Sequence, residues 1–298
     1  MMSNGYTIFD RPLIRQRSRA RDPGADYLFV EGALGLAERL SEINRTFKEV
    51  LTFGPGLAED FFKTKPEKLA KGQDEELLGF PENSFDLVIS NLTLHWVNDL
   101  PGTLVQIRRA LKPDGLFLAV MFGGETLAEL KQSLLMAETE IRGGVSPRVS
   151  PFVEIKDGGH LLQRAGFAMP VTDMDKLTVS YDHPFQLMSE LRAMGENNAL
   201  LERQKTFTGK GTLNRAAEIY QDLFSDAEGR IMASFHFLHL TGWAPGPDQP
   251  KPLKPGSAKV DLRDVFGKKR PKALSGFREF SRNQMVLVDA SAGVHEEF

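Results

Sequence analysis

The most informative pattern in the chain is an unbroken apolar run that ends in a polar and aromatic turn. Residues 87–89 are Leu-Val-Ile, and they are followed by Ser90 and Asn91 and then by His95 and Trp96. An apolar run without alternation is typical of a strand that is buried on both faces, as in a parallel sheet covered by helices. Because ligands bind such sheets beyond the carboxyl ends of the strands, the polar residues after this run are expected at the mouth of a site.

The chain after this run completes a strand, helix and strand unit. Residues 99–111 are predicted to form a helix, residues 112–115 (Lys-Pro-Asp-Gly) a turn, and residues 116–121 a second buried strand. The same periodicities predict further helices at 27–43, 57–63, 127–141, 160–165, 185–194 and 213–224, and strands at 49–53, 171–181 and 231–240. This alternation predicts an α/β fold of the Rossmann-like, doubly wound type, with a mostly parallel sheet and helical additions.

One unit of this alternation is predicted to be missing. Only 29 residues lie between Gly56 and Asp86. Two helices and two strands with short connections need roughly 40 residues or more, at about 11 per helix and 5 per strand. We therefore expect the sheet to lack one helix and strand pair in this stretch.

Composition divides the chain into three predicted parts. Residues 1–46 are predicted to form an N-terminal helical segment, and the arginines between positions 11 and 21 favour a solvated or docking helix there. Residues 47–243 are predicted to form the α/β domain with inserted helices. Residues 244–298 begin with five prolines between positions 245 and 255 and continue into basic residues at 268–272, which predicts a linker and a weakly ordered tail.

Charge and residue usage exclude several kinds of partner and site. A net charge of −3 gives no reason to expect nucleic acid, and the lack of cysteine excludes disulfides and thiolate zinc sites. No apolar run is long enough to span a membrane, and no secretory signal is recognisable, so a cytoplasmic location is predicted. His236 and His239 would point to opposite sides of one strand, and no metal site is predicted.

With these elements placed, their order resembles that of the class I S-adenosylmethionine-dependent methyltransferases. Four segments are also similar to the mitochondrial complex I assembly factor 5 group and its bacterial relatives: LHWVNDLP at 94–101, LKPDGLFLAVMFGGETLAEL at 111–130, SPRVSPF at 146–152 and MGENNA at 194–199. A fifth is Ile-Phe-Asp-Arg at 8–11. The malonyl-carrier methyltransferases of biotin synthesis are more distantly similar. The resemblance implies S-adenosylmethionine as cofactor, a protein substrate or assembly partner, and modification of arginine, which in that group is hydroxylation.

The resemblance assigns four residues to cofactor binding, namely Gly54, Gly56, Asp74 and Asn91. The glycines would form the turn near the methionine end of the cofactor, and Asp74 would face the adenine amine. Each residue also has a plainer interpretation: a tight strand-to-helix turn for the glycines, a solvated loop carboxylate for Asp74, and a side chain that caps the following turn for Asn91.

The same region departs from the methyltransferase pattern. Thr52 stands where the first strand should end in a carboxylate, and Leu57 follows the turn without a third glycine. Pro55 removes a backbone N–H donor from the turn. The missing unit would hold the second strand, whose terminal carboxylate binds the ribose hydroxyls, and no residue can be assigned to that role. The cofactor site is therefore predicted to be weak or lost.

Three residues are candidates for the chemistry. His95 has a side chain suited to general-base catalysis, although it could equally hold the turn by a bond to a backbone carbonyl. Arg148 and Glu196 lie in the segments shared with the assembly-factor group, and they are predicted to bind the side chain of a protein substrate. Trp96 is expected to pack the turn against the sheet.

Three functions remain open from the sequence. The first is a methyltransferase-family protein that acts on a protein side chain with a degraded cofactor site. The second is a catalytically inactive scaffold of the same fold that binds partner proteins. The third is a methyltransferase for a small molecule or for a group on an acyl carrier.

Overall fold

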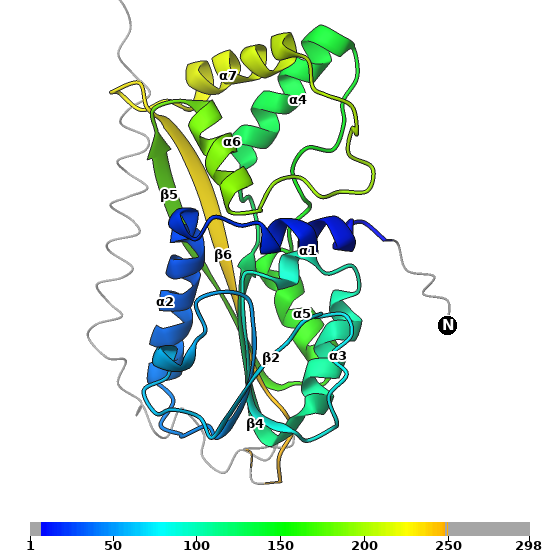
Figure 1. Ribbon diagram of the computed structural model, residues 1–298, viewed down its shortest axis with the longest axis vertical. Helices are drawn as coiled ribbons and strands as arrows, with labels where there is room; N and C mark the ends of the chain where they lie inside the picture. The colour runs from blue at the N-terminus through cyan, green and yellow to red at the C-terminus, as the bar shows by residue number, and fades with distance from the viewer. Residues whose placement is uncertain (1–6, 248, 250–298) are drawn as a thin grey trace, which may run out of the picture. The chain divides into compact units, whose positions relative to one another are not determined.

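A six-stranded sheet organises the chain in the computed structural model, which describes residues 7–247 and 249 (Figure 1). Its order is β2-β1-β3-β4-β6-β5. Four strands are parallel: β2 (Lys68–Lys71), β1 (Glu49–Phe53), β3 (Phe85–Asn91) and β4 (Leu111–Phe122). The strand β6 (Ile231–Trp243) runs antiparallel to both β4 and β5 (Ala168–Tyr181). The predicted α/β fold with a mostly parallel sheet is confirmed.

Helices cover both faces of the sheet. One face carries α2 (Tyr27–Ser41), α4 (Ala128–Arg142), α6 (Pro184–Ala193) and α7 (Lys210–Phe224), and the other carries α3 (Leu100–Ala110) and α5 (Ile155–Ala165). Successive residues of β3 serve the two sides in turn, since Leu87 and Ile89 belong to one apolar cluster and Val88 to the other. This double burial explains the unbroken apolar run in the sequence.

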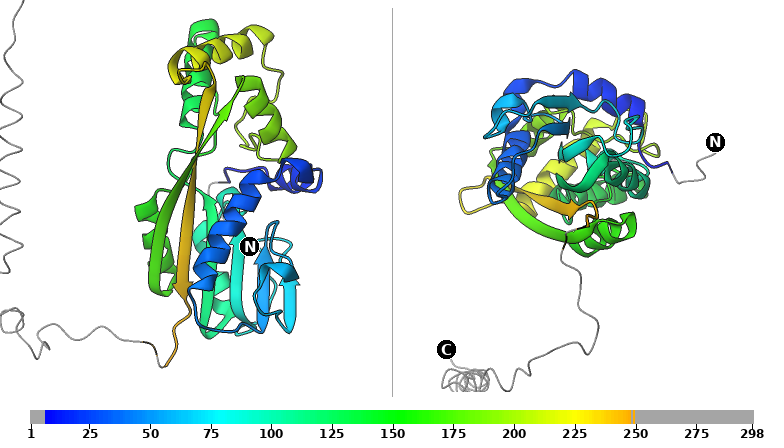
Figure 2. Two further views of the ribbon diagram at one scale, coloured as in Figure 1. Left: turned by 90° about the vertical axis from the view of Figure 1, so that its left-hand side faces the viewer. Right: turned by 90° about the horizontal axis from the view of Figure 1, so that it is seen from below.

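The antiparallel pair of strands β5 and β6 extends beyond the parallel strands, and α6 and α7 lie between these two strands in the sequence. Figure 2 shows both strands continuing past the ends of β3 and β4, with α4 and α7 packed beside the extension. The helix α1 (Arg11–Arg19) lies between the parallel part of the sheet and α6 (Figure 1). These additions create walls around the carboxyl ends of β3 and β4.

The connection between β1 and β3 is short, as predicted. It contains the single strand β2 and one turn of 3-10 helix, η2 (Glu59–Phe61), so a helix and strand pair is missing there. The prediction of a helix at 57–63 is wrong. Leu57 and Phe62 both pack into the apolar core, and the chain between them follows an irregular path. The strand β2 was not predicted from the sequence, because it has only four residues, with lysine at each end, and so lacks an apolar strand pattern.

Two smaller predictions need correction or remain open. The turn predicted at 112–115 is an irregularity inside β4, where Asp114 adopts a φ of 60° and the pairing with β3 shifts register. Short 3-10 turns also occur at η1 (Pro23–Ala25) and η3 (Leu94–Trp96).

The residues from 250 to 298, predicted to form a weakly ordered tail, lie outside the described part of the chain. Within the described residues, no helix is both long and apolar enough to cross a membrane.

A buried histidine links α2 to the antiparallel half of the sheet. The Nε2 atom of His239 on β6 lies 3.0 Å from Oδ2 of Asp175 on β5. Arg39 of α2 pairs with Asp175 at 3.1 Å and with Asp173 at 2.8 Å. Burial, together with the positive charge of Arg39, outweighs the two carboxylates and lowers the pKa of His239 to about 4.

This histidine should make the fold sensitive to mild acid. A folded-state pKa of about 4 lies below the ordinary 6.5, so stability is complete above pH 6.5 and falls as the pH drops from 6.5 towards 4. We expect the free energy of unfolding to fall by about 2 kcal/mol between pH 7 and pH 5. In urea unfolding, the His239→Leu variant should lack most of this decrease between pH 7 and pH 5. The control variant His160→Asn, which changes an exposed histidine, should show the same decrease as the wild type. Equal pH dependence in the two variants would contradict this assignment.

Candidate functional site

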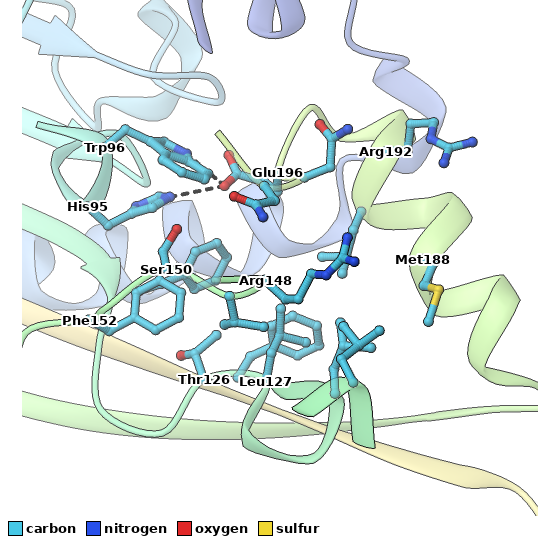
Figure 3. A pocket seen from close by; sticks show the side chains of 18 of the residues that line it. His95, Trp96, Thr126, Leu127, Arg148, Ser150, Phe152, Met188, Arg192 and Glu196 are labelled. Carbon is cyan, nitrogen blue, oxygen red and sulfur yellow. Dashed lines mark hydrogen bonds and ion pairs between the residues drawn. The ribbon is translucent and has the colours of Figure 1, made fainter. Parts of the chain in front are cut away.

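A cavity of about 230 Å³ lies beside the carboxyl end of β4, bounded by α4, α6 and the loops that follow α4 and α6 (Figure 3). Most of its wall is apolar, and His95, Trp96 and Glu196 form a polar side. Further polar groups come from Thr126, Arg148, Ser150, Arg192, Asn197 and Asn198. The apolar side chains come from Phe122, Leu127, Leu130, Leu134, Val149, Phe152, Met188, Leu191, Leu213 and Phe235. The cavity therefore combines a largely water-excluding wall with a small number of placed polar groups, as ligand sites commonly do.

The polar side of the cavity is built around the carboxylate of Glu196. His95 Nε2 lies 3.0 Å and Trp96 Nε1 lies 2.9 Å from the same oxygen, Oε2 (Figure 3). The carboxylate only accepts, so both ring nitrogens donate to it. The Glu196 side chain is 9% exposed and that of His95 is 1% exposed. The second oxygen, Oε1, accepts no hydrogen bond from the described residues and remains available to a ligand.

The turn after β3 places these two ring donors. Leu92 follows the strand in the left-handed region, with a φ of 49°, and redirects the chain into η3. The hydroxyl groups of Ser90 and Thr93 bond to each other at 2.9 Å across this turn. Because a leucine pays an energetic cost in this conformation, the surrounding packing must hold it there.

Arg148 reaches the same cavity, but its charge is already compensated. Its Nε atom donates to Oε1 of the buried Glu138 at 2.8 Å, and its terminal nitrogens bond to Glu138, Thr208 and Gln204. Burial by itself raises the pKa of Glu138, yet the hydrogen bonds from Arg148 and Ser146 outweigh it and hold that pKa below its usual value. The predicted residues His95, Arg148 and Glu196 thus line one cavity, and among these three Glu196 presents the open acceptor.

The N-terminal segment ties together the loops that carry the polar side. Asn98 Oδ1 accepts from the backbone of Ile8 and Phe9 at 2.7 and 2.8 Å, and the Phe9 ring packs edge-on against Trp96 at 5.4 Å. Arg17 donates to the carbonyl groups of residues 197 and 198, both at 2.8 Å. The helix therefore docks on the site, and the sequence did not reveal which loops it would join.

The predicted cofactor residues gather at the neighbouring part of the same sheet edge. Asn91 Nδ2 donates to the carbonyl of Pro55 at 2.9 Å and to that of Phe29 on α2 at 2.8 Å. Gly54 and Gly56 have φ values of 87° and 77°. A side chain at Gly54 would lie 2.0 Å from the backbone oxygen of Asn91, and one at Gly56 would lie 3.2 Å from Ala33. The turn is therefore packed tightly against the protein itself.

The acidic residues of the loop after β2 form ion pairs with α1. Asp74 pairs with Arg11 at 2.9 Å and with Arg15 at 2.6 Å, both from α1, and Arg11 pairs with Glu75 at 2.5 Å. Burial raises the pKa of Asp74, but the hydrogen bond from Arg11 and the further bonds and charges around it lower the pKa below its usual value. Asp74 therefore serves as a partner for the N-terminal helix.

These groups do not fit S-adenosylmethionine as the resemblance requires. The end of β1 offers Thr52, which is buried and donates to the carbonyl of Ala70, instead of a carboxylate. The strand β2 ends at Lys71, and a side chain at the next residue, Gly72, would lie 1.8 Å from the Phe53 ring. The carboxylates expected at the ends of the first two strands are thus missing, and Asp74 is already paired.

A pair of glycine variants tests how tightly this turn is packed. Gly54→Ala should destabilise the fold more than Gly229→Ala, because both positions have positive φ but only Gly54 faces a backbone oxygen at 2.0 Å. We expect about 1 kcal/mol for Gly229→Ala, from the conformation alone, and about 1–3 kcal/mol more for Gly54→Ala. Chemical denaturation of both variants measures the difference. Equal decreases in the free energy of unfolding would show that the turn at Gly54 can accommodate a methyl group.

The two histidines of β6, His236 and His239, contact different parts of the protein. His239 faces α2, whereas His236 faces the turn before α4 and accepts there from the backbone N–H of Glu125 at 3.2 Å. Within residues 7–247, no group of three or more histidine or acidic side chains is arranged to hold a metal ion.

Comparison with known proteins identifies relatives over most of the chain. The family described as "Methyltransferase domain" matches residues 56–119. "Arginine-hydroxylase NDUFAF5, mitochondrial" from Rattus norvegicus is 41% identical over 87% of this chain and 83% of its own length. The Homo sapiens protein of the same name is 39% identical over the same shares. A "Malonyl-[acyl-carrier protein] O-methyltransferase" from Xylella fastidiosa is 38% identical over 58% of this chain and 56% of its own.

The names of these relatives correct one prediction. Both NDUFAF5 proteins are named as mitochondrial, which contradicts the cytoplasmic location predicted from the sequence. That prediction rested on the absence of recognisable targeting features, and such an absence is weak evidence for any compartment.

Proposed function

The chain belongs to the NDUFAF5 arginine-hydroxylase family, and from that premise we propose that it binds an arginine side chain of a protein at Glu196 and hydroxylates it. In this reaction one C–H bond of the arginine becomes C–OH with an oxygen atom from dioxygen, and a two-electron donor with two protons reduces the other oxygen atom to water. The relatives' name supports the reaction, and the cavity supports the place. The resemblance to assembly factors of respiratory complex I makes a subunit of that complex the first substrate to test.

The observation that carries this proposal is the open oxygen of a buried carboxylate. Glu196 is 9% exposed and lines the cavity, and His95 and Trp96 both donate to its Oε2 atom, which leaves Oε1 without a donor among the described residues. A guanidinium group is a planar donor that pairs strongly with carboxylates, and its methylene stem suits an apolar wall. In a cavity of low polarity this pairing is less screened than in water.

The surroundings of Arg148, His95 and Trp96 are compatible with the same ligand. Arg148 does not oppose a second guanidinium, because Glu138 compensates its charge. His95 and Trp96 act as positioning residues, since they fix the orientation of the Glu196 carboxylate. The packed glycine turn and the paired Asp74 favour a reaction that does not depend on methyl transfer from S-adenosylmethionine.

Mass spectrometry of a host that expresses the chain tests this function. Arginine peptides from the host and from co-expressed complex I subunits should gain the mass of one oxygen atom with the wild-type chain and not with Glu196→Gln. Glu202→Gln, an exposed carboxylate in the same loop, should behave as the wild type. Gain of a methyl group in place of oxygen, or no arginine altered by the wild-type chain, would overturn the proposal.

The packed glycine turn and the ion-paired Asp74 favour a second candidate function, that of a catalytically inactive scaffold. In that case the chain would bind partner proteins with no change in their mass, and S-adenosylmethionine would not raise its melting temperature. A raised melting temperature would instead favour the third function, methyl transfer to a small molecule or an acyl carrier.

A further inference from the structure

The cavity is much more apolar than an arginine stem requires. An arginine side chain has three methylene groups between its backbone and its guanidinium. The apolar wall continues from Leu127 to Leu134 along α4, about 10 Å at 1.5 Å per residue, and on to Leu213 of α7. Leu134 and Leu213 therefore belong to an apolar part of the cavity, called here the apolar chamber, that continues along α4 past Leu127.

This apolar chamber is built from buried side chains on three helices and the sheet. Leu130 and Leu134 of α4 are 6% and 8% exposed, and Phe235 of β6 is fully buried. Met188 of α6 and Leu213 of α7 complete it, and Figure 3 shows Met188 on the side of the cavity away from His95. No acidic side chain lines this part of the cavity among the described residues.

We propose that the apolar chamber binds an aliphatic side chain next to the arginine in the substrate, so that the chain recognises an arginine flanked by leucine, isoleucine or methionine. The inference rests on the proposed function and adds a sequence preference to it. The continuity of the chamber with Glu196 argues for this occupant, because one short peptide can place its guanidinium and its apolar neighbour in the same cavity.

The size of the preference follows from the area removed from water. Full burial of a leucine side chain contributes enough binding free energy for a roughly 10- to 100-fold difference in affinity. A basic neighbour would lose its hydration in the chamber without gaining an acidic partner, so it should be rejected more strongly than glycine.

Calorimetric titration of two peptides tests the inference. One peptide carries leucine beside its arginine and the other carries glycine, and the wild-type chain should bind the leucine peptide roughly 10- to 100-fold more tightly. Leu134→Phe should fill the chamber and reduce this preference to less than about threefold, with the affinity for the glycine peptide unchanged. Leu135→Phe is the matched control, since Leu135 is 48% exposed on the same helix.

The outcomes separate this inference from the proposed function. Equal binding of both peptides by the wild-type chain, or a preference that survives Leu134→Phe, overturns the inference and leaves the arginine site standing. Binding of neither peptide overturns the proposed function and the inference together. If Leu134→Phe unfolds, Leu134→Ala provides the second test, because an enlarged chamber should shift the preference from leucine to phenylalanine.

Discussion

Replacement of Arg148 by methionine is expected to lower the free energy of unfolding by about 3–5 kcal/mol, a large share of the stability of a protein of this size. Glu138 is 1% exposed and depends on Arg148 for both a charge partner and hydrogen bonds. Without the guanidinium, the carboxylate stays buried with only the hydrogen bonds from Ser146 and with Arg142 at 3.9 Å, and its pKa should rise. Urea unfolding at pH 7 measures the loss.

A second ion pair on the same helix provides the control. Glu140 of α4 pairs with Arg215 at 2.6 Å, but the two side chains are 44% and 38% exposed. Arg215→Met should therefore lower the free energy of unfolding much less than Arg148→Met does. The double variant Arg148→Met, Glu138→Met should regain most of the stability lost by Arg148→Met, because no charge is left buried. Similar losses for Arg148→Met and Arg215→Met would refute the structural role assigned to Glu138.

The second large effect concerns ligand binding at Glu196. Glu196→Gln keeps the shape of the side chain but removes its charge. Because loss of one partner of a buried charge pair costs about 2–5 kcal/mol of binding free energy, an arginyl peptide should bind the variant at least roughly 30-fold more weakly. Glu202→Gln should leave the affinity unchanged. A lysyl peptide should bind the wild-type chain more weakly than the arginyl peptide, since an ammonium group lacks the planar fork of a guanidinium.

The result would be informative in either direction. Equal affinity of Glu196→Gln and the wild-type chain for the arginyl peptide would mean that the guanidinium is held elsewhere. Folding of the variant can be verified independently, because Trp96 Nε1 can still donate to the amide oxygen of glutamine and the melting temperature should change little.

The parallel core of the fold could be predicted from the sequence because its signals are local. The apolar run at 87–89 belongs to neighbouring residues, and it reflects burial on both faces of the sheet at that place. The helix predicted at 57–63 was wrong for the opposite reason. Leu57 and Phe62 are buried by contacts with distant strands and helices, and periodicity within the segment does not report such contacts.

The site could be predicted only in part. The neighbourhood of Asn91 and the glycine turn followed from the rule that parallel strands end at one edge, and the bond from Asn91 to Pro55 bears this out. The meeting of His95 with Glu196 joins residues 101 positions apart and could be inferred only through the family resemblance. The pairing of Arg11 with Asp74 escaped prediction, because a charged N-terminal helix looks the same in sequence whether it docks or not.

A crystal structure of the chain with an arginyl peptide tests the central claim most directly. The account predicts a guanidinium nitrogen about 2.7–2.9 Å from Oε1 of Glu196, with His95 and Trp96 still bonded to Oε2. A guanidinium seated at Asp74 in place of Arg11, or one bound outside the cavity, would contradict it.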